Sequence, residues 1–548
     1  MSQPIASAKK PTRDGWKASF LPSPDWRADL TAGFLVFLIA LPLSLGIAMA
    51  SGFPPVAGVL TAMVGGVLAT FFGSAPLTIK GPAAGLIVIA LGAVQELGAG
   101  DAATGYKRAL ATIVVAGLLQ VVLGLARAGT LGDAFPGAAV HGMLAAIGVI
   151  IVSKQSHTLL GVKPMAKEPL ELLAEIPHSL THANAEIALI GVVSIATLLM
   201  WPLLSGRWFK AIPPQLIVLG VAIPLGLVFD LDHSHTFTWG GLHGQVGPDY
   251  LVNLPGNLLS ALAWPDFSVV TSATSVKYIA MFALVGSIES LLSAKAVDAL
   301  DPARRESNLS RDLLATGLGN VVAGLIGGLP MISEIVRSSA NITAGARSQW
   351  ANFFHGLLLL AFVVAVPGLL HRIPLAALGA MLVYTGVRLA SPGELVKAWR
   401  VGREQFAVFV TTMLVTLATD LLVGVAAGIV LELVLHLLGG APMRGILRAG
   451  VEYELDGDRH VLRVVPSALF SNFISLKAQL QALDHAVPTV VLDLSQTRYV
   501  DHTTLHGLHQ LQRRFADSGR TLLICGLDEH NPVSDHAHAS RKKDASIG

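Results

Sequence analysis

Residues 74–86 read SAPLTIKGPAAGL, and residues 329–345 read LPMISEIVRSSANITAG. Both stretches open apolar segments that are too short or too interrupted to cross a bilayer alone, with Gly81-Pro82 in the first and Gly327-Gly328 just before the second. Short segments broken at matching places in two halves of a chain indicate a transporter built from inverted repeats, with its site near the middle of the membrane. Ordinary kinked helices are the alternative interpretation, because Gly and Pro are common in membrane-spanning helices.

The composition of the whole chain excludes an ordinary soluble enzyme. Of its 548 residues, 53% are hydrophobic and 14% are charged, whereas soluble proteins average about 25% charged residues. Apolar runs of about 18–22 residues, long enough to cross about 30 Å of hydrocarbon as a helix, recur along most of the chain. A β-barrel shows short alternating segments instead. The single cysteine, Cys525, excludes a disulfide framework, and the net charge of +2 gives no argument for nucleic acid. We therefore predict an all-α polytopic membrane protein.

Fourteen apolar segments are predicted between residues 28 and 441. They are 28–50, 55–73, 82–97, 108–127, 136–154, 186–205, 213–230, 275–298, 309–328, 333–345, 349–369, 373–391, 405–420 and 422–440. With the N-terminus inside, the inner loops carry twelve Lys and Arg residues and the outer loops carry five. The positive-inside rule then predicts cytoplasmic termini in a bacterial-type inner (plasma) membrane. Residues 1–27 are polar and basic without a cleavable apolar stretch, which predicts a cytoplasmic tail rather than a signal peptide.

The composition changes at about Val451. Residues 451–455 and 461–465 alternate like paired strands, TVVLDLS and TLLICGL are typical of further strands, and residues 469–483 and 502–518 have helical spacing. Strands that alternate with helices predict a small soluble α/β domain over residues 451–527. The polar, histidine-containing residues 528–548 are predicted to be disordered.

The two broken segments predict an anion site. Helix N-termini offer unpaired N–H groups and a partial positive charge, so two that face each other form an anion cradle. Lys80 precedes Gly81 in the first break, and Arg337 lies one turn into the second segment. Lys80 attracts the anion, extends to the membrane interface, or pairs with a nearby carboxylate. Arg337 either does the same or contacts backbone carbonyls or Glu289.

Glu289 lies inside the predicted span 275–298. A charge at that depth is costly, so it marks a cavity or a partner. Glu289 and Ser293 share a helix face with small residues, which suits a pocket. The carboxylate takes up a proton, helps to bind Na⁺, or forms a buried ion pair that only holds helices together.

Glu334 follows Ser333 at the start of the second broken segment, where a carboxylate favours the helix but competes with an anion. It is a cap turned away from the substrate, a partner for Lys80, or a second cation or proton site. His233, His235 and His243, and His536 and His538, lack recognised metal-ligand spacing, so we predict no metal site. Signatures of nucleotide hydrolysis and of nucleophilic or zinc hydrolases are absent, so we predict no enzyme.

Three stretches make the chain recognisable. Residues 40–60 (ALPLSLGIAMASGFPPVAGVL), 306–330 (ESNLSRDLLATGLGNVVAGLIGGLP) and 336–349 (VRSSANITAGARSQ) resemble signatures of the SulP family, the sulfate permeases or solute carrier 26 proteins. The likeness covers nearly the whole chain. The C-terminal domain resembles the STAS domain that usually follows the membrane part in this family.

The resemblance implies seven plus seven spans in two inverted repeats, residues 28–231 and 275–441. Spans one to four and eight to eleven would form a mobile core and the others a gate, in an elevator-like cycle and commonly a homodimer. Carried over position by position, the residues around the anion are Leu43, Ser44, Thr78, Ile79, Lys80, Gly81, Ser333, Glu334, Ile335 and Val336. Glu289 and Ser293 would serve the coupling ion, with Arg337 as a structural residue near the site.

The chain departs from the family pattern at four positions. Many members have Gln in place of Leu43, an apolar residue in place of Lys80, and a small or polar residue in place of Glu334. In the STAS-like domain, the Asp-Ser pair of bacterial relatives reads Asp501-His502, which argues against a phosphorylation switch.

The resulting prediction is a secondary active transporter that imports a small inorganic anion, bicarbonate first and sulfate second. An inside-negative potential opposes anion entry by about 2.3 kcal/mol per charge per 100 mV, so a coupling ion, Na⁺ or H⁺, is expected at Glu289. The expected partners are the anion, the coupling ion, the lipid bilayer and a second copy of the chain, with no cofactor other than Na⁺. Alternatives are an uncoupled channel or exchanger, a dicarboxylate transporter, and a sensory protein.

Overall fold

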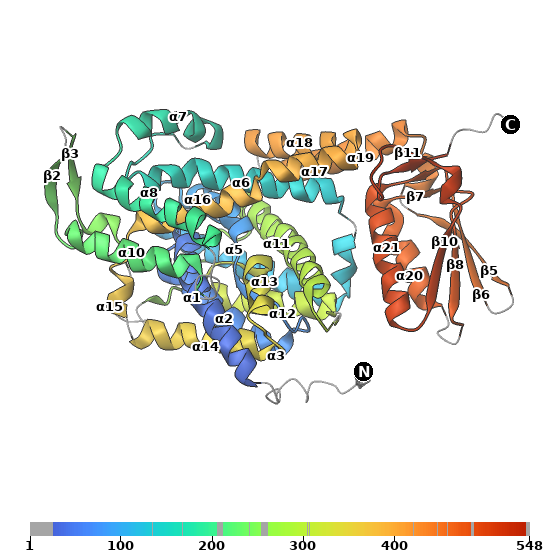
Figure 1. The fold of residues 1–548 in the computed structure, drawn as a ribbon, viewed down its shortest axis with the longest axis horizontal. Helices are drawn as coiled ribbons and strands as arrows, with labels where there is room; N and C mark the ends of the chain where they lie inside the picture. The colour runs from blue at the N-terminus through green and yellow to red at the C-terminus, as the bar shows by residue number, and fades with distance from the viewer. Residues whose placement is uncertain are drawn as a thin grey trace.

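The computed structural model describes residues 26–543, except for 134, 167, 205–211, 240–241, 254–260, 304, 306, 366, 420, 447, 457–458 and 484–486. Figure 1 shows a body of packed helices with an α/β unit at one end, built by the C-terminal residues. Residues 1–25 of the predicted N-terminal tail lie outside the described residues, and its last two residues, Trp26 and Arg27, already belong to the first helix.

Eight helical stretches in the described part are long and apolar enough to cross a membrane. Their helices are α1 (Trp26–Ala50), α2 (Pro55–Val67) with α3 (Ala69–Phe72), α5 (Ala102–Leu125), α6 (Gly137–Leu159), α8 (Ala185–Met200), α11 (Ala273–Leu300), α16 (Leu375–Leu389) with α17 (Pro392–Val401), and α19 (Leu421–Leu438). Each coincides with a predicted apolar segment.

The remaining predicted segments also contain helices, which are shorter or more polar. They are α4 (Ile87–Gly98), α10 (Pro214–Val228), α12 (Leu309–Ile326), α13 (Ile335–Thr343), α14 (Trp350–Ala365) and α18 (Arg403–Ala418). Every predicted apolar segment therefore contains a helix, while fourteen complete crossings stay a prediction.

Several short elements connect these helices, and the sequence does not predict them. They are α7 (Pro169–Thr181), α15 (Pro367–Leu370), the antiparallel hairpin β2 (His235–Trp239) with β3 (Leu242–Val246), and the 3₁₀ turns η2 (Ala84–Leu86), η3 (Ala128–Asp133), η4 (Trp201–Leu203), η5 (Pro248–Tyr250), η7 (Met443–Gly445) and η8 (Leu527–Glu529).

Pairs of glycines let helices from the two halves of the chain pack at backbone distance. A Cβ atom added at Gly117 of α5 would lie 2.8 Å from the backbone oxygen of Gly317 of α12, and one added at Gly317 would lie 2.7 Å from that of Gly117. The same mutual contact joins α6 with α16 through Gly148 and Gly386, and α2 with α14 through Gly66 and Gly356. The hydrophobic effect does not drive helices together in lipid. Small residues at such crossings stabilise the contact instead, because they let the two backbones pack closely.

The C-terminal unit has two sheets and two helices. One sheet has the order β10 (Thr521–Cys525), β8 (Thr489–Asp493), β6 (Arg459–Val465) and β5 (Gly450–Asp456), in which only β5 is antiparallel to its neighbour. The other has the order β11 (Asn531–Pro532), β12 (Arg541–Lys542), β9 (Tyr499–Val500) and β7 (Ser467–Ala468). Helices α20 (Phe470–Ala482) and α21 (His502–Asp517) share a buried core with the first sheet. The predicted paired strands, further strands and helices are thus present.

The prediction of a disordered tail is wrong for residues 528–543. Strand β12 pairs with both β9 and β11, and Lys543 Nζ donates a 2.7 Å hydrogen bond to the carbonyl of Ser495. A polar composition argues against a packed core, but backbone pairing with an existing strand orders this segment without one. Residues 544–548 lie outside the described part.

Candidate functional site

The two broken segments meet each other through a short antiparallel sheet. Strand β1 (Ile79–Pro82) pairs with β4 (Met331–Glu334), so that Ile79 lies opposite Glu334 and Pro82 opposite Met331. After β1 the chain enters η2 and α4, and after β4 it enters α13. Antiparallel pairing places the starts of the two short helices at opposite ends of this two-stranded sheet, with α13 beside Ile79 and η2 beside Met331.

Buried side chains satisfy the backbone groups that the second break frees. The Thr61 hydroxyl accepts a 2.6 Å hydrogen bond from the N–H of Leu329 and donates one of 3.0 Å to its carbonyl. Asn320 does the same for Met331, accepting at 2.6 Å and donating at 3.2 Å. Non-helical backbone at membrane depth persists only where protein groups replace the lost helical bonds. Asn320, which belongs to the recognised signature, thus has a structural reason to be there.

The first break is held in the same way by residues of the second half. The Ser338 hydroxyl accepts a 2.8 Å hydrogen bond from the N–H of Ile79, and Asn352 Oδ1 accepts one of 3.2 Å from that of Lys80. Asn341 Nδ2 donates a 3.0 Å bond to the carbonyl of Leu77. The two breaks are therefore fixed as one unit.

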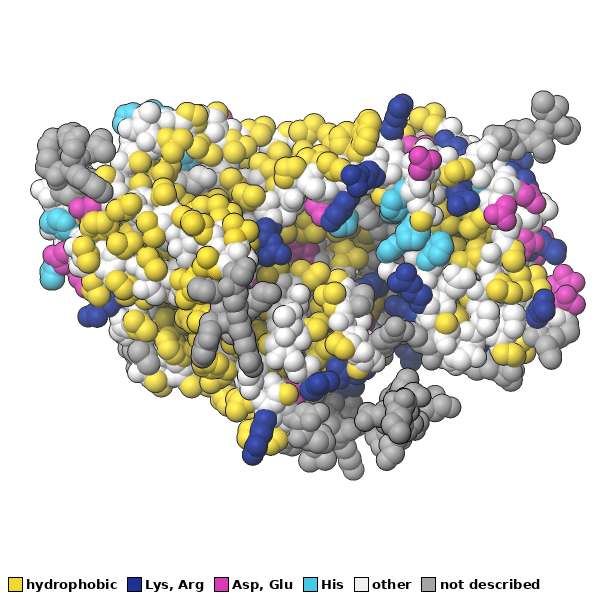
Figure 2. Space-filling view, in the orientation of Figure 1, with side chains coloured by type: hydrophobic (Ala, Val, Ile, Leu, Met, Phe, Trp, Pro, Cys, Tyr) yellow, Lys and Arg dark blue, Asp and Glu magenta, His cyan; other side chains and the backbone are white. Residues whose placement is uncertain are grey.

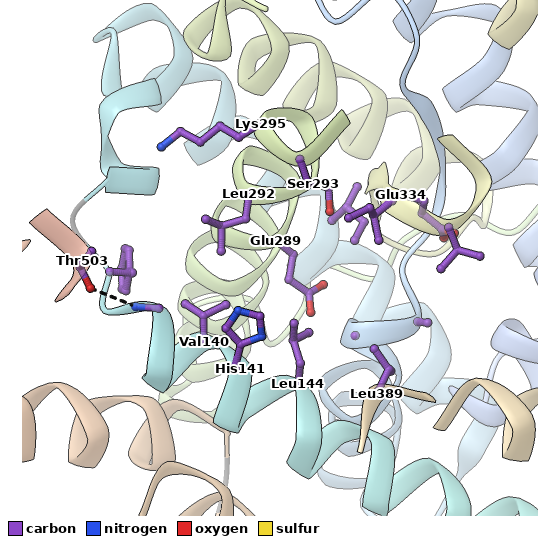
Figure 3. Close-up of a pocket in the computed structure, with 18 of the residues that line it drawn as sticks. Val140, His141, Leu144, Glu289, Leu292, Ser293, Lys295, Glu334, Leu389 and Thr503 are labelled. Carbon is purple, nitrogen blue, oxygen red and sulfur yellow. Dashed lines mark hydrogen bonds between the residues drawn. The ribbon is translucent and has the colours of Figure 1, made fainter. Parts of the chain in front are cut away.

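A cavity of about 530 Å³ adjoins this unit. It is lined by Ala84, Gly85, Phe135, Gly137, Val140, His141, Leu144, Glu289, Leu292, Ser293, Lys295, Ala296, Ile332, Glu334, Ile335, Val336, Thr385, Leu389, Phe473, Thr503, His506, Gly507 and Gln510. One end is formed by the breaks and α11, and the other end reaches α20 and α21 of the C-terminal unit (Figure 3).

Glu289 is a buried acidic residue whose carboxylate faces the cavity. Its side chain reaches from α11 into the space near Leu144 and Leu389 (Figure 3), and the residue is only 6% exposed. Neither carboxylate oxygen has a hydrogen-bond partner among the described residues. The carboxylate lies directly against Gly85, where an added Cβ would overlap it. An unpartnered carboxylate at this depth is suited to bind a proton or a cation.

Lys80 does not line this cavity, and its role as a cation beside the substrate stays a prediction. Its Nζ lies 2.8 Å from Asp312 Oδ2, and it also donates to Ser333 Oγ at 2.8 Å and Thr316 Oγ1 at 3.3 Å. The Lys80 and Asp312 side chains are 3% and 1% exposed. A buried ammonium needs a counter-charge, and α12 supplies it. The Lys80 charge is thus neutralised away from the lining.

Glu334 pairs with Arg337 and not with Lys80, which excludes one of the three hypotheses for Glu334. The ion pair joins Arg337 Nε and Glu334 Oε2 at 3.1 Å, one turn apart on α13. Arg337 is fully buried, and its guanidinium lies against Gly81. The expected contact with Glu289 is absent among the described ion pairs. Glu334 also lines the cavity, so it does not turn away from that space.

The predicted site residues divide into two groups. Those that line the cavity are Glu289, Ser293, Glu334, Ile335 and Val336. Those that do not are Leu43, Ser44, Thr78, Ile79, Lys80, Gly81, Ser333 and Arg337. Ser44 is fully buried with a hydroxyl that has no hydrogen-bond partner among the described residues. A role in anion binding stays a prediction for every one of them.

Some lining residues were not among those predicted from the sequence. Ala84 and Gly85 lie at the start of the first short helix, and their signal was the small-residue run GPAAGL. His141 comes from α6 and Thr385 from α16, where nothing local marks them. Thr503, like the other lining residues of α21, is distant in sequence and reaches the cavity only through the packing of the C-terminal unit.

Comparisons with known proteins cover both parts of the chain. The model of the Sulfate permease family matches residues 26–412. The Bicarbonate transporter BicA of Synechocystis is 26% identical over 520 residues, which cover 91% of this chain and 88% of that protein. The Putative sulfate transporter YvdB of Bacillus subtilis is 25% identical over 511 residues, which cover 92% of each chain.

Two solved structures resemble the fold. The transmembrane domain of a cyanobacterium bicarbonate transporter BicA superposes with a TM-score of 0.61 at 25% identity, covering 74% of this chain and 98% of that one. The overall structure of SLC26A9 gives a TM-score of 0.69 at 16% identity, covering 96% of this chain and 87% of that one, a likeness of fold alone.

Proposed function

This chain belongs to the Sulfate permease family, and we propose that it is a multi-pass membrane transporter of a small inorganic anion. The relatives described above are named as transporters of bicarbonate or sulfate, and not as enzymes. The observation that carries the proposal is the antiparallel pairing of β1 with β4 beside the cavity. The first residues of both short helices line that one cavity of about 530 Å³. Unpaired N–H groups at such starts favour a negatively charged ligand.

The proposed architecture is fourteen spans in two inverted repeats of seven. Exchanging the repeats turns the second span into the ninth and the fourth into the eleventh. The glycine contact of α2 with α14 joins spans two and eleven, and that of α5 with α12 joins spans four and nine, so each contact is the counterpart of the other. The contact of α6 with α16 joins spans five and twelve, which are each other's counterparts. This agreement supports the repeat.

The cavity supports an elevator-like division into core and gate. Glu289, Ser293 and Glu334 belong to spans eight and ten of the proposed core, whereas His141 and Thr385 belong to spans five and twelve of the proposed gate. A site between the two bodies is exposed to one side of the membrane at a time as the core moves. With cytoplasmic termini, the end of the cavity at the C-terminal unit opens toward the cytoplasm.

Bicarbonate is the proposed substrate, with sulfate second. Lys80 and Arg337 are each paired with a carboxylate, so they add no net charge to the cradle. The attraction then comes from helix N-termini, which carry about half a charge each. Two such ends match a singly charged anion better than a doubly charged one.

Glu289 is the proposed coupling residue for Na⁺ or H⁺, with Ser293 beside it. Both carboxylate oxygens lack a hydrogen-bond partner among the described residues, and the side chain faces the cavity. A cation or proton bound there compensates the charge of the anion during inward transport. We further propose a homodimer in a bacterial-type plasma membrane, with the C-terminal unit as a STAS domain.

The test is radiolabelled uptake by the purified full-length chain in proteoliposomes. Bicarbonate, sulfate and fumarate are compared under imposed Na⁺ and H⁺ gradients. We expect one gradient to drive bicarbonate accumulation, with slower sulfate uptake and none of fumarate. Uptake that does not depend on either gradient would support an uncoupled exchanger or channel instead. Faster uptake of fumarate than of bicarbonate and sulfate would support a dicarboxylate transporter.

A further inference from the structure

A second group of buried polar side chains lies where the helical body meets the C-terminal unit. Glu432 and His436 are one turn apart on the same face of α19, and Asp501 begins α21 as its N-cap. All three are nearly inaccessible, with exposures of 1%, 1% and 0%. The proposed transport cycle uses none of them.

The distances within this group suit a metal ion better than hydrogen bonds. His436 Nε2 lies 3.8 Å from Glu432 Oε1 and 3.7 Å from Asp501 Oδ2, and one ligand atom from each residue fits within 4.8 Å of the others. Both nitrogen–oxygen distances exceed the range of a hydrogen bond. Two ligands of one Zn²⁺ ion, each bound at about 2.1 Å, lie about 3.4 Å apart at the tetrahedral angle. The two distances from His436 Nε2 need to contract by only a few tenths of an ångström to reach this value.

Several polar atoms of this group have no hydrogen-bond partner in the described part of the chain, although Glu432 Oε1 and Asp501 Oδ2 each accept one hydrogen bond. Both ring nitrogens of His436, and also Glu432 Oε2, lack a hydrogen-bond partner within the described part of the chain. A buried polar atom without a partner is costly, and a bound ion removes that cost. The imidazole is held between the rings of Phe470 and Tyr499, with centroid distances of 5.7 Å and 5.2 Å.

Neighbouring groups fix the two carboxylates in place. Gln405 Nε2 donates a 3.0 Å hydrogen bond to Glu432 Oε1. Asp501 accepts one of 2.7 Å from the N–H of Thr504 and one of 2.5 Å from that of Phe470. Such outer partners orient the ligands of protein metal sites. Each carboxylate oxygen still has a lone pair for a metal.

The two buried carboxylates of this group favour a bound cation. Glu432 and Asp501 bring two carboxylates into one buried space, and the adjacent Glu404 already interacts with Lys542 at 3.2 Å and with the Tyr499 hydroxyl at 2.8 Å. A divalent ion would balance both carboxylates with His436 neutral. The competing explanation is a protonated His436 shared between the two carboxylates.

We propose that Glu432, His436 and Asp501 bind a divalent transition-metal ion of the Zn²⁺ type, with water in the remaining position. One imidazole and two carboxylates are a common ligand set for such ions. Because α19 and α21 supply ligands together, the ion would fasten the C-terminal unit to the last helix of the membrane part. It adds to the other contacts there, such as the 2.7 Å bond from Ser534 Oγ to the carbonyl of Val401.

The test uses the purified full-length chain, stripped with a chelator and titrated with Zn²⁺. Bound metal is measured by mass spectrometry, and stability by the thermal unfolding midpoint in detergent. We expect one tightly bound ion that raises the midpoint. H436Q and E432Q should weaken this binding at least about 100-fold, because even outer partners of a metal cost about 10–100-fold. X-ray absorption should show one imidazole with oxygen ligands.

Surface histidines supply the matched control. His506 and His538 lie close together on the C-terminal unit, with their Nδ1 atoms 3.4 Å apart, and would bind Zn²⁺ separately. H506Q/H538Q should therefore retain the tight ion and the stabilisation. Loss of the tight ion in H506Q/H538Q, or retention in both H436Q and E432Q, would overturn the proposal. So would an absorption spectrum with several imidazoles, or a wild-type chain without a Zn²⁺-dependent midpoint, which would favour the protonated His436. These readouts do not depend on transport.

Discussion

The cavity has an inner end at β1, β4 and α11, within the helical body, and an outer end at the C-terminal unit, and the two ends are built in different ways. At the inner end, the charged residues of β1, β4 and α13 are buried and already paired, whereas Glu289 of α11 has no hydrogen-bond partner among the described residues. At the outer end, α21 presents His506 among further imidazoles, which Figure 2 shows gathered where the C-terminal unit adjoins the helical body. The comparison teaches that a charge in the sequence does not by itself make a binding group. Most charged residues at the inner end stabilise the two breaks, whereas the histidines at the outer end are neutral until they are protonated.

The largest expected effect comes from breaking the Lys80–Asp312 pair. K80A would leave Asp312 buried without its 2.8 Å partner, and removing one member of a buried pair costs about 3–5 kcal/mol. We expect a large fall in the thermal unfolding midpoint of the detergent-solubilised chain, with unchanged anion affinity in the protein that remains folded.

The double variant K80M/D312N is the control for this pair. It removes both charges while nearly keeping their volumes, so it should recover most of the stability lost in K80A. If K80A weakened anion binding while leaving the unfolding midpoint unchanged, Lys80 would belong to the binding site after all.

The next effect concerns the one inner-end carboxylate without a partner. E289Q keeps the shape of the side chain but removes its charge and its proton site. One uncompensated charge costs about 2.3 kcal/mol per 100 mV, so the accumulation ratio of the anion should fall about 50-fold at that potential. Radiolabelled uptake into energised proteoliposomes measures the ratio.

Glu96 offers a matched change outside the cavity. It forms a 3.1 Å ion pair with Lys277 in which both side chains are substantially exposed, so E96Q should leave accumulation unchanged. Equal accumulation by E289Q and the parent chain, with the same cation dependence, would remove Glu289 from the coupling mechanism.

A smaller effect is expected from the glycine that supports Glu289. In G85A the new methyl group would overlap the carboxylate and force it to move. Overpacking of this kind costs about 1–3 kcal/mol. We expect gradient-driven uptake to fall more than exchange of labelled for unlabelled anion, because the coupling group moves while the helix starts remain.

Gly137 provides the comparison for this variant. It also lines the cavity, but a Cβ added there would meet no atom within 4 Å, so G137A should transport like the parent. Equal coupling in G85A and the parent chain would mean that the carboxylate relaxes without consequence.

The inner end could be predicted from the sequence because its signals are local. Gly, Pro and polar residues interrupt apolar runs at residues 74–86 and 329–345, and an acidic residue in an apolar helix marks Glu289. Helix positions followed from apolar length alone. Pairing of Lys80 with a carboxylate was one of the alternatives, but its partner could not be predicted, because Asp312 lies 232 positions away and nothing in either segment selects it.

The outer end escaped prediction for the same physical reason. Its lining depends on how α21 packs against α6, where Gly137 N–H points to Thr503 Oγ1 at 3.5 Å. The tail that carries His538 is mostly polar, so composition indicated disorder, whereas pairing of β12 with β9 orders it. Glu432 and Asp501 likewise come together only in the folded chain.

The smallest expected effect is a pH dependence at the outer end. Burial, followed by the neighbouring His509 and His506, lowers the pKa of His538 from 6.5 to about 4. Burial also lowers the pKa of His502 and of His506, although Asp501 opposes the shift at His502 and Arg513 adds to it at His506. Between pH 6.5 and about 4 the unfolded state then binds more protons than the folded state. The stabilisation is complete above pH 6.5 and is lost as the pH falls through this window.

Hydrogen exchange of the α21 amides, corrected for the intrinsic rate and measured with chelator present, tests this dependence in the full-length chain. Protection should decrease from pH 7.5 to pH 5, and H538Q should reduce the decrease because Gln does not titrate. His233 is the control, since its hydrogen bond to Asp230 raises its pKa and it lies on the exposed loop before β2. H233Q should behave like the parent. Protection that is equal at both pH values, or a decrease unchanged in H538Q, would show that the imidazoles do not govern the outer end, and the contrast with the fixed charges of the inner end would fail.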